Sequence, residues 1–239
     1  FARRIQERLL PSKDGVKGLF VDYVYQPSQL LSGDIFDIIP LEGDCVGIYV
    51  SDVAGHGVAA SMMTMFIHHT VRNIAQDISD PAKLLKAVHK QFTKLDLGVD
   101  RYFSLLYARY NIKTGEFVFS NAGHNCAPLL LRDRRVEVLE LHGFPIMTLR
   151  KDLDFQERTI WLKEGDRVLF YTDGCVEIMD GHGNMFGVDG LAALYQAYGS
   201  GLLEDLFQRV MKFGWGEQKD DYAMLLIESE MPVSKVSEC

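Results

Sequence analysis

The stretch that decides the fold reads Tyr49-Val50-Ser51-Asp52-Val53-Ala54-Gly55-His56-Gly57. A run of apolar and β-branched residues leads into the single carboxylate of Asp52. The chain then passes through a Gly-His-Gly turn and resumes at Val58 with a long apolar pattern of helical type. A strand, an acid and a glycine turn into a helix hold a charged group at the rim of a sheet and leave the backbone accessible. We therefore expect Asp52 at the end of a buried strand.

Three other places in the chain repeat this arrangement of an acid beside an apolar strand. Asp34 precedes one predicted strand, Asp173 follows another, and the pair Asp220-Asp221 precedes the last. A single aspartate at such a position is more often a turn or capping residue than a ligand. If the strands lie side by side, these carboxylates converge at one rim, and spacing alone leaves both interpretations open. The turn or cap interpretation is preferred for four further acids, Asp133, Asp152, Asp166 and Asp180.

Converging carboxylates need a source of positive charge. They repel one another, and without compensation some of them take up protons at neutral pH. Ligation by carboxylates, backbone carbonyls and water suits Mg²⁺ or Mn²⁺ better than Zn²⁺, which prefers His and Cys. Two such ions about 3.5–4 Å apart can activate water and hold a phosphoryl group for in-line attack. Convergence would therefore predict a site for two Mn²⁺ or Mg²⁺ ions.

The composition limits the class of protein. The chain has 239 residues, of which 47% are hydrophobic and 24% charged, and this is ordinary for a globular domain with a full core. Its net charge of −8 argues against a nucleic-acid binder. No apolar run approaches the length of a membrane span. The four cysteines form no C-x-x-C pair, and we expect a reducing, cytoplasmic location. The chain begins with Phe, which suggests a fragment of a longer protein.

Hydrophobic periodicity predicts strands that come mostly in hairpins and helices that come in sequential pairs. Hairpins are expected across residues 42–44, 111–115, 133–134 and 163–166. This grouping favours antiparallel sheets over parallel βαβ units. We predict one α+β domain, a four-layer α-β-β-α sandwich in which two mainly antiparallel sheets are flanked by helices. The expected helices are 58–75, 81–95, 188–198 and 202–213, and the expected strands are 18–26, 35–41, 44–51, 102–110, 116–120, 127–131, 136–141, 155–162, 167–172 and 222–228.

The first residues form an amphipathic stripe. Phe1, Ile5 and Leu9 recur every four residues, and Pro11 ends the helical pattern. The stripe fits either a terminal helix packed on its own domain or the end of a linker helix from an upstream domain. We divide the chain into an N-terminal linker or regulatory helix (1–11), a catalytic domain (12–230) and a C-terminal tail (231–239).

At this point the ordered motifs resemble a family. They are similar to the SpoIIE-like serine/threonine phosphatase domains of the metal-dependent type 2C (PPM) protein phosphatases. The motifs run along almost the whole chain: Ile5-Gln6 with Leu9-Leu10-Pro11, Ser32-Gly33-Asp34-Ile35-Phe36-Asp37, Ser51 to Gly57, Asn121-Ala122-Gly123-His124-Asn125, Gly165-Asp166, Tyr171-Thr172-Asp173-Gly174-Cys175-Val176-Glu177, Phe186-Gly187 and Asp220-Asp221. Ser32 stands where the family often has Gly, and Ala223 where Thr is frequent, but no departure removes a carboxylate.

The resemblance implies an α-β-β-α sandwich that hydrolyses phosphoserine or phosphothreonine on a protein, and it implies the ligands. Asp52 would bridge both ions, with the carbonyl of Val53 as a further ligand. Asp173 and Asp220 would complete one ion. Asp34 would hold a water on the ions or the second ion itself.

Three more residues are expected beside the ions, in contact with phosphate or with the ligands: His56, Gly55 and Asp221. Asp221 is less favoured than its neighbour as a ligand, because the family's ligand aligns with the first acid of the pair. His56 either contacts phosphate and orients water or is a turn residue bonded to the backbone. His124 is expected to support the sheets and not to take part in catalysis.

The resemblance also implies partners. The expected substrate is a phosphoserine-bearing anti-sigma-factor antagonist, and the expected upstream element is a receiver or sensor domain. A homodimer stays open. Two alternatives remain: a regulatory module that binds such a partner with weak or no turnover, and a phosphodiesterase or small-molecule phosphatase that uses the same ions.

Overall fold

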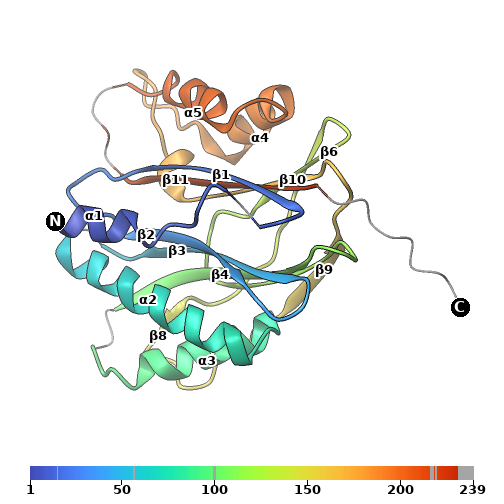
Figure 1. The fold of residues 1–239 in the computed structure, drawn as a ribbon. Coiled ribbons are helices and arrows are strands. Elements are labelled where there is room, and N and C mark those ends of the chain that lie inside the picture. Colours follow the sequence, from blue (N-terminus) through green and yellow to red (C-terminus); the bar gives the residue numbers. More distant parts are fainter. Residues whose placement is uncertain (15, 56, 99–100, 216–217, 219, 231–239) are drawn as a thin grey trace, which may run out of the picture.

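Two antiparallel sheets lie face to face, with helices on both outer faces (Figure 1). The structure is a computed structural model that describes residues 1–14, 16–55, 57–98, 101–215, 218 and 220–230. The predicted α+β class and its four layers are therefore confirmed. The predicted tail 231–239 lies outside the described residues.

The first sheet, sheet I, has the strand order β2-β3-β4-β5-β9, and β8 pairs with β4 at one end. Its interior strand β3 is buried along almost its whole length, because helices cover one face and the other sheet covers the second. This explains why β3 has a continuous apolar run instead of an alternating pattern. The strands of sheet I are β2 (Asp34–Pro40), β3 (Cys45–Val53), β4 (Tyr102–Asn111), β5 (Glu116–Ala122), β8 (Ile146–Met147) and β9 (Glu157–Trp161).

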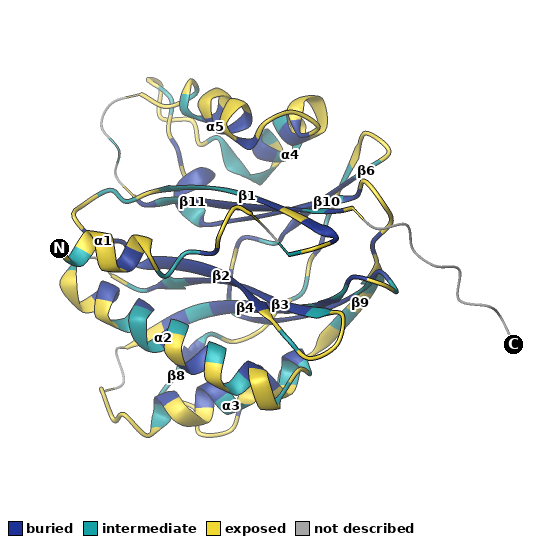
Figure 2. Ribbon diagram, in the orientation of Figure 1, coloured by how far each residue is buried: buried dark blue, intermediate teal, exposed yellow. Residues whose placement is uncertain are grey.

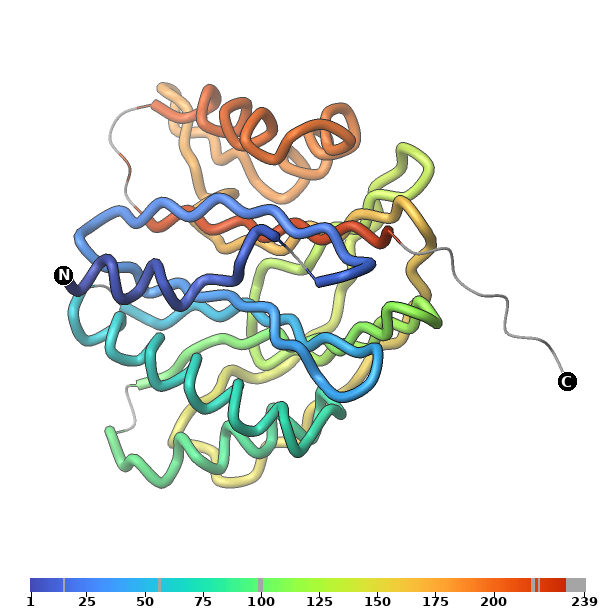
Figure 3. The backbone as a smooth tube through the Cα atoms, viewed as in Figure 1, coloured from blue at the N-terminus to red at the C-terminus, as the bar shows by residue number. Residues whose placement is uncertain are grey.

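The second sheet, sheet II, has the order β1-β11-β10-β6-β7. It brings the two ends of the chain together, because β1 pairs with β11 along its whole length, and Figure 3 shows these first and last strands side by side. The strands of sheet II are β1 (Leu19–Gln26), β6 (Leu129–Arg132), β7 (Arg135–Val138), β10 (Arg167–Tyr171) and β11 (Tyr222–Ser229).

Two helix pairs form the outer layers. The pair α2 (Val58–Asp77) and α3 (Pro81–Thr93) covers sheet I, whereas α4 (Gly187–Tyr198) and α5 (Leu203–Met211) cover sheet II. Figure 2 shows the buried faces of all four helices turned toward the sheets. Asp80 caps α3 by accepting a hydrogen bond from the backbone N–H of Lys83 at 3.0 Å, as expected before a proline-initiated helix. No helix in the described part of the chain has the length and apolar character that a bilayer crossing requires.

The space between the sheets is filled by large aromatic and aliphatic side chains. Phe117 contacts Phe119 and Phe170 at ring-centroid distances of 5.8 and 6.4 Å, and so joins sheet I to sheet II. All three rings are fully buried. Aromatic burial of this kind contributes much of the stability of a two-sheet core. The sheets therefore form one rigid frame whose strand ends meet at a common rim.

One predicted hairpin is wrong. Residues 163–166 do not join paired strands, because β9 pairs with β5 in sheet I whereas β10 pairs with β11 and β6 in sheet II. The turn crosses between the sheets. It bonds to both, with the Leu162 N–H donating to the Gly115 carbonyl and the Gly165 N–H to the Ser229 carbonyl. A four-residue turn suits either connection, so the length of the turn did not reveal the crossing. The other predicted hairpins, 42–44, 111–115 and 133–134, are confirmed.

The N-terminal helix is shorter than predicted. It spans α1 (Ala2–Glu7), and its residue Gln6 is completely buried although the helix surface is largely exposed. The sequence analysis also missed the two-residue strand β8 and the 3₁₀ turn η1 (Asp173–Cys175). Both are too short to produce a periodic signal.

Candidate active site

Sheet I contributes two of the predicted acids to one rim. Asp34 is the first residue of β2, and the antiparallel register places it directly opposite Asp52 on β3. Opposed residues on adjacent strands have side chains only a few ångströms apart. Asp34 is buried and Asp52 is half-buried. The predicted proximity of these two acids therefore follows from strand pairing.

Sheet II contributes the other acids. Asp173 lies two residues after the last residue of β10, and Asp220 lies two residues before the first residue of β11. Because β10 and β11 are antiparallel neighbours, the end of one strand meets the start of the other. The two segments touch closely: a Cβ on Gly174 would lie 2.0 Å from the Asp221 carbonyl oxygen. The glycine after Asp173 is required by this close approach.

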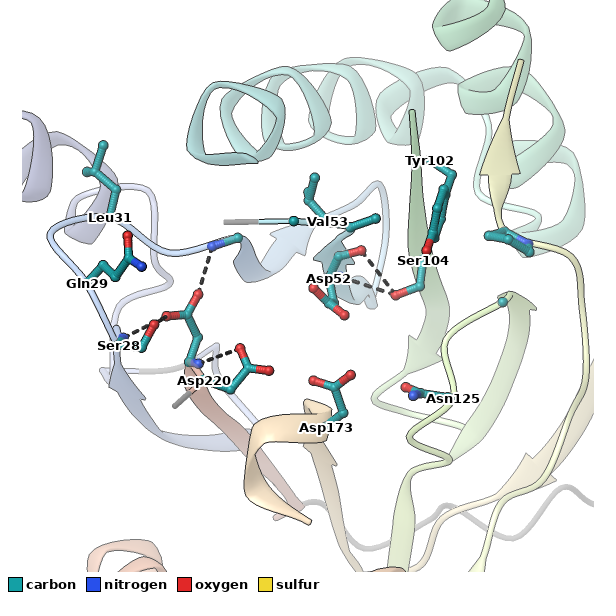
Figure 4. Close-up of a pocket in the computed structure, with 16 residues that line it drawn as sticks. Ser28, Gln29, Leu31, Asp52, Val53, Tyr102, Ser104, Asn125, Asp173 and Asp220 are labelled. Atoms are coloured by element: carbon teal, nitrogen blue, oxygen red, sulfur yellow. Dashed lines mark hydrogen bonds between the residues drawn. The ribbon is translucent and has the colours of Figure 1, made fainter. Parts of the chain in front are cut away.

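The two rims face each other across a pocket of about 610 Å³ (Figure 4). Asp52 projects from sheet I, and Asp173 and Asp220 project toward it from sheet II. Val53, Gly55 and Asp221 also line the pocket, whereas Asp34 is not among the lining residues and lies buried opposite Asp52 on the neighbouring strand. The structure thus brings together all the predicted acids, and separates the buried Asp34 from those that reach the pocket.

Among the described residues that line the pocket, no lysine or arginine balances the negative charge of the carboxylates. Burial raises the pKa of Asp52 to about 7, and the negative charges of Asp173, Asp220 and Asp221 add to the rise. The pKa of Asp34 is also raised, first by burial and then by the charge of Asp52. Burial, followed by repulsion from Asp173 and Asp221, raises the pKa of Asp220. Each of these carboxylates would gain from a nearby cation.

Asp221 differs from its neighbour. Its carboxylate accepts four hydrogen bonds: from the N–H and Oγ of Ser28 at 2.7 and 2.9 Å, from Ser32 Oγ at 2.6 Å and from the Gly33 N–H at 2.8 Å. These bonds tie the loop before β2 to the start of β11. The carboxylate oxygens of Asp221 are thus hydrogen-bonded to the loop that leads to Asp34, whereas the side chain of Asp220 points into the pocket.

The donor set fits divalent cations of the Mg²⁺ and Mn²⁺ type. Asp52, Asp173 and Asp220 place carboxylate groups around one pocket. A bound cation would offset the electrostatic repulsion between these groups. Within the described residues, no three His, Cys, Asp or Glu side chains lie close enough to hold one ion as they stand. Mutual repulsion keeps these carboxylates apart, and a bound cation would reduce that repulsion.

The glycine turn that follows Asp52 approaches this pocket. Gly55 has a left-handed φ of 99° and lines the pocket. The carbonyls of Val53 and Gly55 lie near Gly33, where a Cβ would be 3.3 Å from each oxygen. Glycine at position 33 leaves room for these two carbonyls. His56, which was predicted beside phosphate, lies outside the described residues.

Several lining residues were not predicted as site residues. Tyr102, Ser104 and Asn125 all line the pocket. Ser104 sits opposite Asp52 in the β3–β4 register, and its Oγ lies 3.3 Å from both the N and the O of Asp52. Strand pairing, which the sequence does not display, would have been needed to find Ser104. Asn125 carried a signal, because it ends the Asn121–Asn125 motif.

Comparison with known proteins identifies the family. The family model described as Stage II sporulation protein E (SpoIIE) matches residues 42–230. The chain is 30% identical over 181 residues to phosphoserine phosphatase RsbP of Bacillus subtilis, covering 74% of this chain and 44% of that protein. It is 20% identical to phosphoserine phosphatase RsbU of the same organism over 236 residues, covering 96% of this chain and 69% of RsbU. The chain thus spans less than half the length of RsbP.

Solved structures share the fold. The RsbU and RsbW domains of Rv1364c from Mycobacterium tuberculosis match with a TM-score of 0.78 and 26% identity, covering 91% of this chain and 61% of that one. The SiaA-PP2C domain of Pseudomonas aeruginosa matches with a TM-score of 0.81 and 21% identity, covering 95% and 93%. These similarities confirm the resemblance that the motifs indicated. The chain therefore belongs to the SpoIIE family.

Proposed function

We propose that this chain hydrolyses phosphoserine or phosphothreonine on a protein with the help of Mn²⁺ or Mg²⁺. One observation carries the proposal: Asp52, Asp173 and Asp220 face one pocket from two different sheets, and the pKa of Asp52 is raised to about 7 by burial and by its acidic neighbours. Acids that served only the fold would be paired with cations or hydrogen-bond donors of the same chain, as Asp166 and Asp221 are. The relatives named phosphoserine phosphatases support the same reaction class.

We assign the ions to Asp52, the Val53 carbonyl, Asp173 and Asp220, with Asp34 behind them. Bound divalent ions supply positive charge for phosphoryl oxygens and lower the pKa of water. The chain's own contribution is positioning. Paired strands hold Asp34 and Asp52 in register, and the contact between Gly174 and Asp221 holds Asp173 beside Asp220. Ser104 hydrogen-bonds to the backbone of Asp52 and fixes the end of β3.

The finer substrate is also a proposal. We propose a phosphoserine on a small regulatory protein, an anti-sigma-factor antagonist, dephosphorylated in the cytoplasm. The printed names of RsbP and RsbU support phosphoserine, and a solved neighbour that joins RsbU and RsbW domains in one chain supports a signalling context. In this proposal residues 12–230 are the catalytic output domain of a longer protein with an upstream receiver or sensor domain.

The N-terminal helix is proposed to carry regulation. Gln6 donates to the Ser32 carbonyl at 2.8 Å and to Thr64 Oγ1 at 3.1 Å, and it accepts from the Ser32 N–H at 3.0 Å. Ser32 in turn bonds to Asp221, so α1 is linked to the loop that leads to Asp34. These contacts support a role for residues 1–11 as a regulatory helix, and a homodimer formed through it is part of the same proposal. Removing residues 1–11 should change activity or oligomeric state, and no change in either would contradict the role.

The decisive experiment measures phosphate release from a phosphoserine protein with Mn²⁺, with Mg²⁺ and with EDTA. We expect release only with an added ion, and almost none from Asp173→Asn under any condition. Retention of the phosphoprotein without release would support the alternative of a regulatory binding module. Hydrolysis of bis(p-nitrophenyl) phosphate faster than of the phosphoprotein would support a phosphodiesterase.

A further inference from the structure

The motif Asn121-Ala122-Gly123-His124-Asn125 forms a rigid corner at the edge of the pocket. The side chain of Asn121 donates to the carbonyls of His124 at 2.9 Å and Leu141 at 2.6 Å, and it accepts from the His124 N–H at 2.8 Å. Gly123 has a φ of 73°, and a Cβ there would lie 2.5 Å from the Pro145 nitrogen. The backbone of the corner is therefore held from both sides, and its last residue has a defined position.

The histidine of this corner joins the two sheets. His124 is buried, with Nε2 3.0 Å from the Tyr171 carbonyl of sheet II and Nδ1 3.0 Å from Ser104 Oγ of sheet I. A carbonyl only accepts, so Nε2 carries the proton and Nδ1 accepts from the serine. Ser104 then contacts the backbone of Asp52. His124 thus links the strand of Asp52 to Tyr171, the last residue of the strand that leads to Asp173.

Asn125 is the residue that this corner presents to the pocket. It is exposed, it lines the pocket, and Figure 4 shows its amide beside Asp173 and on the far side from Ser28. Its oxygen accepts a long contact from Cys126 Sγ at 3.4 Å. In the described part of the chain its amide nitrogen donates no hydrogen bond. The corner thus holds the backbone at Asn125, and the side chain brings an unused donor beside the Asp173 carboxylate.

The chemistry of the pocket leaves a role for such a donor. No lysine or arginine is among the described residues that line it. A phosphomonoester carries several strong acceptor oxygens, and cations at the carboxylates can contact only some of them. A neutral amide is not repelled by nearby carboxylates, and its NH₂ group can donate two hydrogen bonds. It is thus suited to bind phosphate in a pocket whose protein charges are negative.

We propose that the Asn125 side-chain amide donates a hydrogen bond to a non-bridging phosphoryl oxygen of the bound phosphoserine, and that Asn121 and His124 are positioning residues for it. The inference rests on the proposed function and identifies a substrate-binding residue that is no metal ligand. It also explains why the chain keeps a tightly bonded five-residue corner at this edge.

The test compares Asn125→Ala and the isosteric Asn125→Asp with the unchanged chain. In the presence of Mn²⁺, calorimetric affinity for inorganic phosphate should fall about tenfold for Asn125→Ala, and kcat/KM on a phosphoserine protein should fall roughly 10- to 100-fold. Asn125→Asp, which replaces a donor with a negative acceptor, should bind phosphate more weakly than Asn125→Ala. Mn²⁺ affinity should stay unchanged in Asn125→Ala, because no ligand is removed. The matched control is Asn73→Ala, an exposed asparagine on α2 outside the pocket, which should change neither quantity.

Phosphate affinity and kcat/KM within twofold of the unchanged chain in both variants would overturn the proposal. A parallel loss of Mn²⁺ affinity in Asn125→Ala would also overturn it, because the residue would then act through the ions. Failure of the proposed function gives a different result, namely an unchanged chain that binds phosphate with Mn²⁺ but releases none from the phosphoprotein. Calorimetry still compares the variants in that case.

Discussion

The two ends of strand β10 carry the same residue type in opposite surroundings. Asp166 precedes the strand and Asp173 follows it. Asp166 is 4% exposed, and its carboxylate accepts hydrogen bonds from Arg132 Nε at 2.9 and 3.1 Å and from the Lys163 N–H at 2.7 Å. Asp173 faces a pocket that it shares with Asp52 and Asp220. One end of the strand has a built-in cation, and the other end has only further acids.

This difference separates structural acids from functional ones. A buried carboxylate that pairs with an arginine of the same chain is already compensated, and it stabilises the crossing between the two sheets. Carboxylates gathered without a cation are a cost to the fold unless an ion from solution joins them. Asp221 shows a third arrangement, in which hydroxyl and backbone donors satisfy the charge. The partners that balance the charge of a carboxylate therefore distinguish a structural acid from a candidate ligand better than its burial does.

The largest expected effect is on activity at the pocket. Asp52→Asn should lower kcat by about 1000-fold, equivalent to about 4 kcal/mol in the barrier, because a carboxylate that we propose as a ligand of the ions is lost. In EDTA the free energy of unfolding should stay equal or rise, because one repelling charge is gone. Phosphate release and urea denaturation measure the two quantities. Normal turnover of this variant with Mn²⁺ would contradict a functional role for the acids in the pocket.

Asp221 should respond through stability. Asp221→Ala removes the acceptor of four hydrogen bonds and leaves buried donors on Ser32 and Gly33, so unfolding should become easier by about 3 kcal/mol. The adjacent Asp220→Asn is the matched control, and its unfolding free energy in EDTA should change by less than about 0.5 kcal/mol. Equal losses in the two variants would mean that the two acids are not used differently.

Mn²⁺ should stabilise the folded protein only by binding at the pocket. At a Mn²⁺ concentration 100 times the dissociation constant, the unfolding free energy should rise by about 2.7 kcal/mol. Asp173→Asn should lose most of this gain, whereas Asp166→Asn should retain it. Chemical denaturation with and without Mn²⁺ provides the measurement. A gain that survives in Asp173→Asn would place the ions elsewhere.

The smallest effect is expected at the arginine-paired end. Asp166→Asn should lower the free energy of unfolding by about 2 kcal/mol, less than for a fully buried pair, because the Arg132 side chain is 31% exposed and partly screened by water. Its kcat, measured on the folded protein with Mn²⁺, should match that of the unchanged chain. A large loss of kcat would show that the two ends of β10 are coupled.

Local sequence patterns anticipated much of the fold. The apolar run before Asp52 predicted a buried strand, and Pro81 predicted the start of a helix. The structure contains both. The crossing at residues 163–166 could not be predicted in the same way, because a short turn fits two topologies. Asp166 was interpreted as a turn residue, and it does accept the Lys163 N–H within the turn. Its arginine partner lies on β6, 34 residues away, where no local pattern could show it.

The sequence by itself determined the candidates for chemistry: acids beside apolar strands, a glycine turn after Asp52, and a set of motifs whose order indicated the family. Only the tertiary structure decided which acids meet, which are compensated and which face open space. Pairing between β2 and β3 placed Asp34 opposite Asp52, and packing of the two sheets brought Asp173 and Asp220 across from them. The reason is physical. A local pattern fixes the direction of a side chain along its own strand, whereas the charge around a carboxylate depends on residues that are distant in the chain and near in space.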